Sequence, residues 1–157
     1  MNLKVFGLLF IFYAKECISS RILVLFPSTS RSHLIVMQGL TTALAERGHH
    51  VTVVSPFPLD NKMENYRDIK IEFDDKQNDF VQNMVNDPGN SKNVLKQFPA
   101  LMNFCLKTGN DSLNMPQMRY LMNKEKFDLV ITGFFLNNYM LGIADHFKVW
   151  NINLNFN

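Results

Sequence analysis

Residues 21–58 read RILVLFPSTSRSHLIVMQGLTTALAERGHHVTVVSPFP and carry the clearest pattern of secondary structure in the chain. Residues 21–26 form a short β-branched and aliphatic run, typical of a strand that is buried on both faces. Pro27 ends this run, and apolar residues then recur at helical spacing as far as Gly48, a residue type that commonly ends a helix. Residues 51–54 form a second apolar strand. The order strand, helix, strand predicts a βαβ unit.

The rest of the chain adds further strands and helices to this unit. The expected strands are residues 69–73, 129–132 and 149–156. The expected helices are residues 94–123, in pieces broken near Gly109 and Pro116, and residues 137–147. Residues 74–93 are polar and contain a turn signal at Pro88-Gly89. The predicted fold class is α/β, a Rossmann-like parallel sheet with helices on both faces.

Composition places the chain among globular proteins. Its 157 residues suffice for one ordinary domain, and 46% of them are hydrophobic. The net charge is +2 and the Lys and Arg residues are scattered, so no nucleic-acid partner is expected. The last expected strand is followed by no helix that could cover it, which predicts that the chain is a fragment or the product of a truncated transcript.

The first twenty residues differ from the rest. Lys4 precedes an almost entirely apolar run at residues 5–13, and Cys17 and Ser19 supply small residues at the spacing that a signal peptidase accepts. The run is too short to span a bilayer, so a cleaved secretory signal at residues 1–19 is expected, followed by a domain at residues 20–157. An uncleaved anchor and an extended first strand are the alternatives.

Cysteine usage is consistent with a lumenal domain without a disulfide. Loss of the signal would leave only Cys105, which has no internal partner. Asn110-Asp111-Ser112 is an acceptor tripeptide for N-glycosylation, which is meaningful only if the segment is lumenal and exposed.

His33 is the candidate catalytic residue. It follows the first strand, on the edge of the sheet where open α/β proteins bind their ligands. The partial positive charge of a helix amino terminus disfavours the imidazolium form, and a neutral histidine is the form that a general base requires. The alternative is a histidine that is simply hydrogen-bonded at the start of a helix.

The other histidines and the loops offer no second site. His49 and His50 lead into a strand from the opposite end of the sheet, and His146 lies late in a helix. No pair of histidines has metal-ligand spacing, so no metal is expected. The loop after the first strand lacks the Gly-x-Gly-x-x-Gly and Walker patterns, which disfavours a Rossmann-type dehydrogenase and a nucleotide-phosphate cradle in this chain.

Soft apolar side chains recur at helical spacing further along the chain, at Phe98, Leu101, Met102, Cys105 and Leu106. Such a stripe favours ordinary core packing, because apolar stripes usually face cores, and the alternative is that these side chains line an adaptable apolar pocket.

Two blocks of the sequence resemble the amino-terminal domain of membrane-bound UDP-glycosyltransferases, the UDP-glucuronosyltransferase-like enzymes of animals. The first block combines Ser32-His33 after the first strand with ERGHHVTV at residues 46–53 after the helix. The second block is FDLVIT at residues 127–132. The similarity extends over nearly all of the expected mature chain.

This resemblance implies one half of a two-domain GT-B fold. The amino-terminal half of such an enzyme binds a small lipophilic acceptor, the carboxyl-terminal half binds the UDP-sugar, and a membrane helix anchors the protein in the endoplasmic reticulum. His33 would take the proton from the acceptor hydroxyl, which attacks the anomeric carbon with inversion. Ser32, Phe98 and Met102 are expected to contact the acceptor. The UDP-sugar is a co-substrate, and no cofactor is implied.

One position departs from the family pattern. An acidic residue after the second block orients the histidine in these enzymes, and Gly133 stands at the matching position here. Asp128 and Asp145 are not obvious substitutes. Because such a carboxylate can contribute several orders of magnitude in rate, and no UDP-sugar site is found, the chain alone is expected to be inactive. The alternative is a non-catalytic module that binds lipophiles or modulates full-length relatives by homo- or hetero-oligomerisation.

Overall fold

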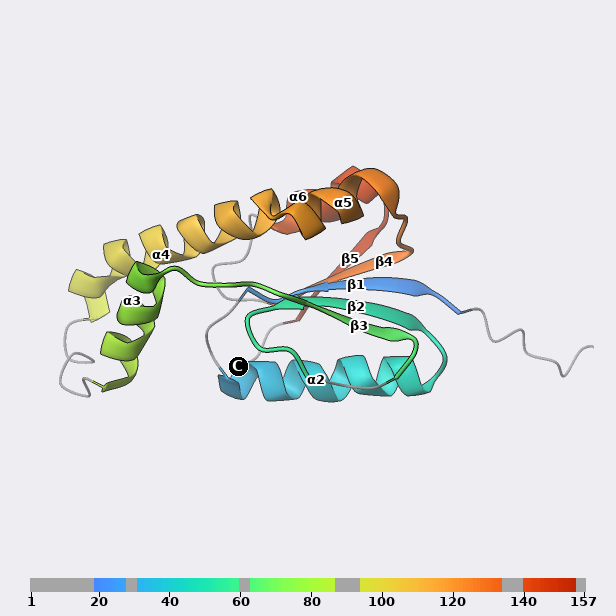
Figure 1. Ribbon diagram of the computed structural model, residues 1–157, viewed down its shortest axis with the longest axis horizontal. Coiled ribbons are helices and arrows are strands. Elements are labelled where there is room, and N and C mark those ends of the chain that lie inside the picture. The colour runs from blue at the N-terminus through green and yellow to red at the C-terminus, as the bar shows by residue number, and fades with distance from the viewer. Residues whose placement is uncertain (1–18, 28–30, 60–62, 87–93, 134–139, 155–157) are drawn as a thin grey trace, which may run out of the picture.

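The computed structural model describes residues 19–27, 31–59, 63–86, 94–133 and 140–154, and residues 1–18, which include most of the expected signal, lie outside this description. The described chain forms a five-stranded sheet with helices on both faces (Figure 1). The strands are β1 (Arg21–Leu25), β2 (His50–Ser55), β3 (Tyr66–Lys70), β4 (Leu129–Gly133) and β5 (Trp150–Leu154). The helices are α2 (Arg31–Glu46), α3 (Asp75–Asn86), α4 (Val94–Asn114), α5 (Pro116–Lys124) and α6 (Leu141–Phe147).

The sheet is parallel and doubly wound, which confirms the predicted fold class. Its strand order is β3-β2-β1-β4-β5, and every adjacent pair is parallel. From β1 the chain builds one side of the sheet through β2 and β3, and then crosses back to place β4 on the other side of β1. The order therefore reverses between β1 and β4, and ligands of such sheets bind at the carboxyl ends of the strands at this reversal.

Two apolar cores lie on the two faces of the sheet, because successive side chains of a strand point to opposite faces. The core on the α2 side contains Ile22, Val24, Phe26, Leu34, Met37, Ala45, Val51, Val53, Tyr66 and Ile131. The core on the opposite side contains Leu23, Leu25, Val54, Ile71, Met118, Leu121, Phe127, Val130, Met140, Ile143 and Ala144. Alternate residues of β1 thus hold α2 on one face and α5 and α6 on the other (Figure 1).

Several expected boundaries are confirmed and others are corrected. Gly48 has a φ of 89° and ends α2 as predicted, and the helical segment breaks before Pro116. The predicted break near Gly109 is wrong, because α4 continues through this residue. The third strand is Tyr66–Lys70 rather than residues 69–73. The parts of the predicted last helix and last strand at residues 137–139 and 155–156 lie outside the described residues.

The polar segment after Asp74 contains a helix, α3, that the sequence analysis did not predict. The Oδ1 atom of Asp74 accepts a hydrogen bond from the Gln77 backbone N–H at 2.8 Å, and the Gln77 side chain returns one to the Asp74 backbone N–H at 2.9 Å. This reciprocal pair is a capping box, which satisfies two donors at the start of a helix. Among the described helices, none is long and apolar enough to cross a membrane.

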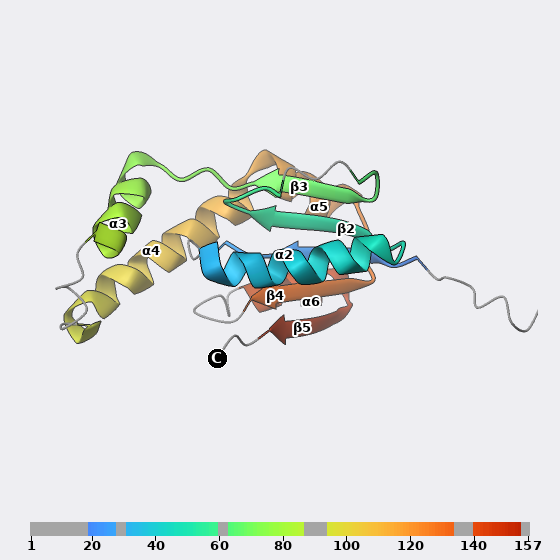
Figure 2. The same cartoon turned by 90° about the horizontal axis from the view of Figure 1, so that it is seen from below.

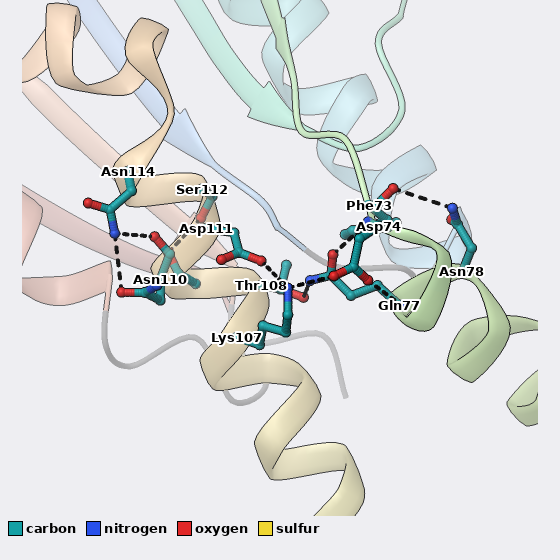
Figure 3. A network of polar contacts seen from close by, with 11 residues as sticks. Phe73, Asp74, Gln77, Asn78, Lys107, Thr108, Asn110, Asp111, Ser112 and Asn114 are labelled. Carbon is teal, nitrogen blue, oxygen red and sulfur yellow. Dashed lines mark hydrogen bonds and ion pairs between the residues drawn. The ribbon is translucent and has the colours of Figure 1, made fainter.

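A polar network holds α3 against α4 (Figure 3). The Lys107 Nζ atom lies 2.6 Å from Asp111 Oδ2 and 2.8 Å from Asp74 Oδ2, and the Gln77 side chain donates to the Thr108 hydroxyl at 3.0 Å. The hydrogen bond from Lys107 lowers the pKa of Asp74 below its ordinary value of 3.8. Hydrogen bonds to Asp111 and Asp74 raise the pKa of Lys107 above 10.5. The network fixes the position of α4, the helix that carries Phe98 and Met102.

We expect Lys107→Met to lower the free energy of unfolding near neutral pH, and the difference from the wild type to shrink at both pH extremes. The lowered pKa of Asp74 stabilises the fold above 3.8, and this contribution is lost as the pH falls through the folded-state value. The raised pKa of Lys107 stabilises the fold below 10.5, and this contribution is lost as the pH rises through the folded-state value.

Urea unfolding at acidic, neutral and alkaline pH measures this difference. The exposed Lys126 lies outside the network described here, and Lys126→Met is the matched control. A difference between Lys107→Met and wild type that stays constant with pH would contradict the assignment.

Candidate functional site

The candidate site lies at the carboxyl edge of the sheet, between the ends of β1 and β4. The chain leaves β1 for α2 on one face of the sheet, whereas α6 after β4 lies on the other face (Figure 1). The amino terminus of α2 lies at the end toward which the strand arrows point (Figure 2). The described residues at this edge are Phe26, Pro27, the first turn of α2 and Gly133.

His33 lies in the first turn of α2, where the sequence placed it. It is the third residue of this helix and its side chain is half-buried. Ser32 precedes it and is exposed. Ser32 is the second residue of α2, and residues 28–30 of the preceding loop lie outside the described residues. The position of His33 fits a general base, and its role stays a prediction.

Phe98 and Met102 lie in a different layer from His33. They belong to the amino-terminal half of α4, which extends past the carboxyl end of the sheet on the face opposite α2 (Figures 1 and 2). Phe98 is 51% exposed and Met102 is half-buried, whereas Phe104 stacks on Phe80 with ring centroids 4.8 Å apart. Helix α4 therefore packs on α3 through Phe104, and Phe98 is left on the surface. The grouping of Phe98 and Met102 with Ser32 and His33 around one acceptor stays a prediction.

Gly133 is in close contact with Phe26 across the β1–β4 pair. A Cβ atom at Gly133 would overlap Cδ2 and Cε2 of the Phe26 ring, and Phe26 is only 1% exposed. A larger residue at Gly133 therefore requires a buried aromatic ring to move. The space next to the end of β4 is filled by the Phe26 ring, so a carboxylate cannot project there with the ring in this position.

The two aspartates near the second block do not replace that carboxylate. Asp128 lies at the amino end of β4, where its Oδ2 atom accepts a hydrogen bond from the Arg21 backbone N–H at 2.7 Å. Asp145 is exposed on α6, which runs from Leu141 to Phe147. Neither one lies at the end of β1 or β4 where the first turn of α2 begins.

The other three histidines lie away from the carboxyl edge. His50 begins β2, and the Nδ1 atom of His49 accepts a hydrogen bond from the Ser20 backbone N–H at 3.2 Å. The Nε2 atom of His146 lies 2.9 Å from the Met122 carbonyl oxygen. Within the described ranges, no group of three or more His, Cys, Asp or Glu side chains could hold a metal ion.

Two candidate sites of covalent modification lie on α4. Asn110 of the acceptor tripeptide is exposed, whereas Ser112 is buried and its hydroxyl donates to the Gly109 carbonyl at 2.9 Å. N-glycosylation requires that the tripeptide is exposed and that it is lumenal, and the exposure of Asn110 satisfies the first of these conditions. Cys105 is a free, half-buried thiol, and burial raises its pKa, which disfavours the reactive thiolate.

A groove that the sequence did not predict lies beside the first turns of α2, and we call it the α2 groove. It has a volume of about 580 Å³ and is lined by Leu34, Ile35, Gln38, Pro56, Phe57, Pro58 and Lys70. It opens next to the helix turn that carries His33. The sequence feature that could have indicated this groove is Pro56-Phe57-Pro58, which follows the second strand at the carboxyl edge of the sheet. Only the folded chain places this segment against α2.

The strand order and the helix placement define a doubly wound α/β domain. One histidine, His33, lies near its switch point, the place between β1 and β4 where the strand order reverses. No protein-family model matches the chain. UDP-glycosyltransferase UGT5 of Dactylopius coccus is 30% identical to it over 139 residues, which is 83% of this chain and 26% of that protein. This similarity supports the UDP-glycosyltransferase family that the two sequence blocks indicated, and the chain spans 26% of the length of that relative.

One solved structure is also similar to the described fold. It is titled "Crystal structure of LpCGTa in complex with UDP", and the similarity covers 87% of this chain and 30% of that chain. The TM-score is 0.45 and the sequence identity is 18%. The strand order and helix placement of this chain, rather than this similarity, define its fold.

We expect Gly133→Ala to lower the free energy of unfolding by about 1–3 kcal/mol, because the added methyl group overpacks the site against Phe26. The matched control is Gly39→Ala in α2, where a Cβ would meet nothing within 4 Å. This control should raise the stability by up to about 1 kcal/mol, because alanine is the better helix former.

Urea unfolding of both variants measures the two effects. A second substitution, Phe26→Leu, should remove part of the cost of Gly133→Ala, so that the double variant is more stable than the sum of the two single changes predicts. Gly133→Ala without a loss of stability would show that the ring moves freely.

Proposed function

We propose that this chain is the acceptor-side portion of an inverting UDP-glycosyltransferase. The full-length enzyme would transfer a hexosyl or glucuronosyl group from a UDP-sugar to the hydroxyl of a small lipophilic acceptor. The observation that carries the proposal is the position of His33 in the first turn of α2, at the carboxyl edge of the β1–β4 switch point. The similarity to UDP-glycosyltransferase UGT5 supports the choice of family.

The proposed chemistry begins with proton transfer to the imidazole of His33. A ring nitrogen accepts the proton of the acceptor hydroxyl while the acceptor oxygen attacks the anomeric carbon of the sugar. The bond between that carbon and the β-phosphate oxygen breaks, and UDP leaves with the electron pair. Attack from the face opposite the leaving group inverts the configuration. A positioned general base of this kind contributes about 10²–10⁴-fold to the rate.

The UDP-sugar is expected to bind mainly to polypeptide that corresponds to the rest of the relative. The described loops of this chain carry no glycine-rich phosphate cradle, and the chain spans 26% of UDP-glycosyltransferase UGT5. We therefore expect the chain alone to be inactive. We place the full-length form in the endoplasmic reticulum, with this domain in the lumen and a membrane anchor outside it, on the strength of the expected signal at residues 1–19.

A second candidate is a non-catalytic module that binds lipophiles or associates with full-length relatives. The contact between Phe26 and Gly133 favours it, because it fills the position from which an acid would orient His33. Without that carboxylate the imidazolium formed during transfer is less well stabilised. The two candidates share a lipophilic ligand and differ in whether His33 transfers a proton.

A chimera separates the two candidates. The stretch of UDP-glycosyltransferase UGT5 that matches this chain is replaced by the chain, and turnover of 1-naphthol is assayed with UDP-glucose and UDP-glucuronate. We expect measurable transfer that His33→Ala lowers by about 10²–10⁴-fold. His50→Ala, at the opposite end of the sheet, should leave the rate unchanged and is the matched control.

The binding of 1-naphthol to the chimera and to the chain alone is measured in parallel by calorimetry. A folded chimera that binds 1-naphthol but does not turn it over would support the non-catalytic candidate. Transfer that does not depend on His33 would contradict the assigned base, and turnover by the chain alone would contradict its expected inactivity.

A further inference from the structure

The α2 groove offers an open apolar surface at the carboxyl edge. Ile35 is 67% exposed although it lies one turn into a helix that packs on the sheet through Leu34. Pro56, Phe57 and Pro58 form the facing wall. The groove volume of about 580 Å³ lies within the range of about 300–1,000 Å³ typical of small-molecule sites.

The wall of the groove is fixed by hydrogen bonds rather than left as a loose loop. The carbonyl oxygen of Phe57 accepts hydrogen bonds from the Ser55 hydroxyl at 3.1 Å and from the Gln38 side chain at 3.4 Å. The backbone N–H of Leu59 donates to Asp68 at 3.1 Å. The segment after β2 is therefore tied to both α2 and β3, which fixes this wall of the groove in place.

Lys70 supplies a positive charge on the same side of the sheet. Alternate residues of β3 face one layer, and Tyr66 faces α2, because its hydroxyl lies 3.1 Å from that of Thr41. Lys70 is four residues further along the strand and therefore faces the α2 side as well. Its Nζ atom lies 3.7 Å from Glu72 Oε1, and both side chains are largely exposed, at 58% and 82%. Such an ion pair is weak and can be displaced by a ligand.

We propose that the α2 groove binds a small lipophilic carboxylate, with its apolar body against Leu34, Ile35 and Phe57 and its carboxylate on the ammonium group of Lys70. The apolar wall selects a hydrocarbon or aromatic body, and the cation at the rim selects an anionic end over a neutral one. This binding does not depend on glycosyl transfer, so it holds for either candidate function.

Decanoate and decanol are the probes, because they share a hydrocarbon chain and differ in charge. We expect calorimetry with the whole chain to show decanoate binding about three- to tenfold more tightly than decanol. Lys70→Gln should lower the affinity for decanoate to that for decanol and leave the affinity for decanol unchanged. Lys126→Gln removes an exposed lysine that does not line the groove and should change neither affinity.

Ile35→Asn tests the apolar wall and should lower the affinities for decanoate and for decanol by about fivefold or more. Val36→Asn is the matched control, since Val36 is the neighbouring residue, is 57% exposed and does not line the groove. Circular dichroism and urea unfolding verify that each variant is folded. Equal affinities for decanoate and decanol in the wild type, no binding of decanoate, or a preference that survives Lys70→Gln would overturn the proposal.

Discussion

The parallel pairing of β1 with β2 on one side and with β4 on the other determines where the helices and the candidate site lie. The apolar residues of β1 are at most 2% exposed, and they divide between the two cores. Helix α2 connects β1 to β2 and α6 connects β4 to β5, and β2 and β5 lie on opposite sides of the β1–β4 pair. Because such crossovers are right-handed, the two helices lie on opposite faces of the sheet. The place of His33 near this reversal follows from the order of the strands rather than from any single loop.

The same edge contains the contact that bears on the proposed role of His33. Phe26 fills the space beside Gly133, so a carboxylate cannot project from the end of β4 toward the proposed base with the ring in this position. A catalytic pair would need the carboxylate within hydrogen-bonding distance of the His33 imidazole. Relatives that carry an acidic residue at the position of Gly133 need a smaller or displaced side chain at the position of Phe26. Phe26 and Gly133 are thus expected to vary together.

The sequence predicted those features that depend on local periodicity. The apolar runs around β1, β2 and β4, the helical spacing before Gly48 and the order of the elements suffice for a parallel sheet and for the edge that carries His33. The helix α3 was missed because its polar composition concealed the capping box of Asp74 and Gln77. The α2 groove and the contact between Phe26 and Gly133 could not be predicted, because each joins segments that only the folded chain brings together.

Histidine side-chain NMR is the direct test of whether a lipophilic ligand binds next to His33. The chain has four histidines, and the structure places only His33 at the carboxyl edge. Titration of the labelled chain with 1-naphthol should shift the imidazole resonances of His33 and leave those of His49, His50 and His146 in place. Shifts confined to the histidines at the opposite end of the sheet, or no shift of His33 at saturating 1-naphthol, would contradict the position of the site.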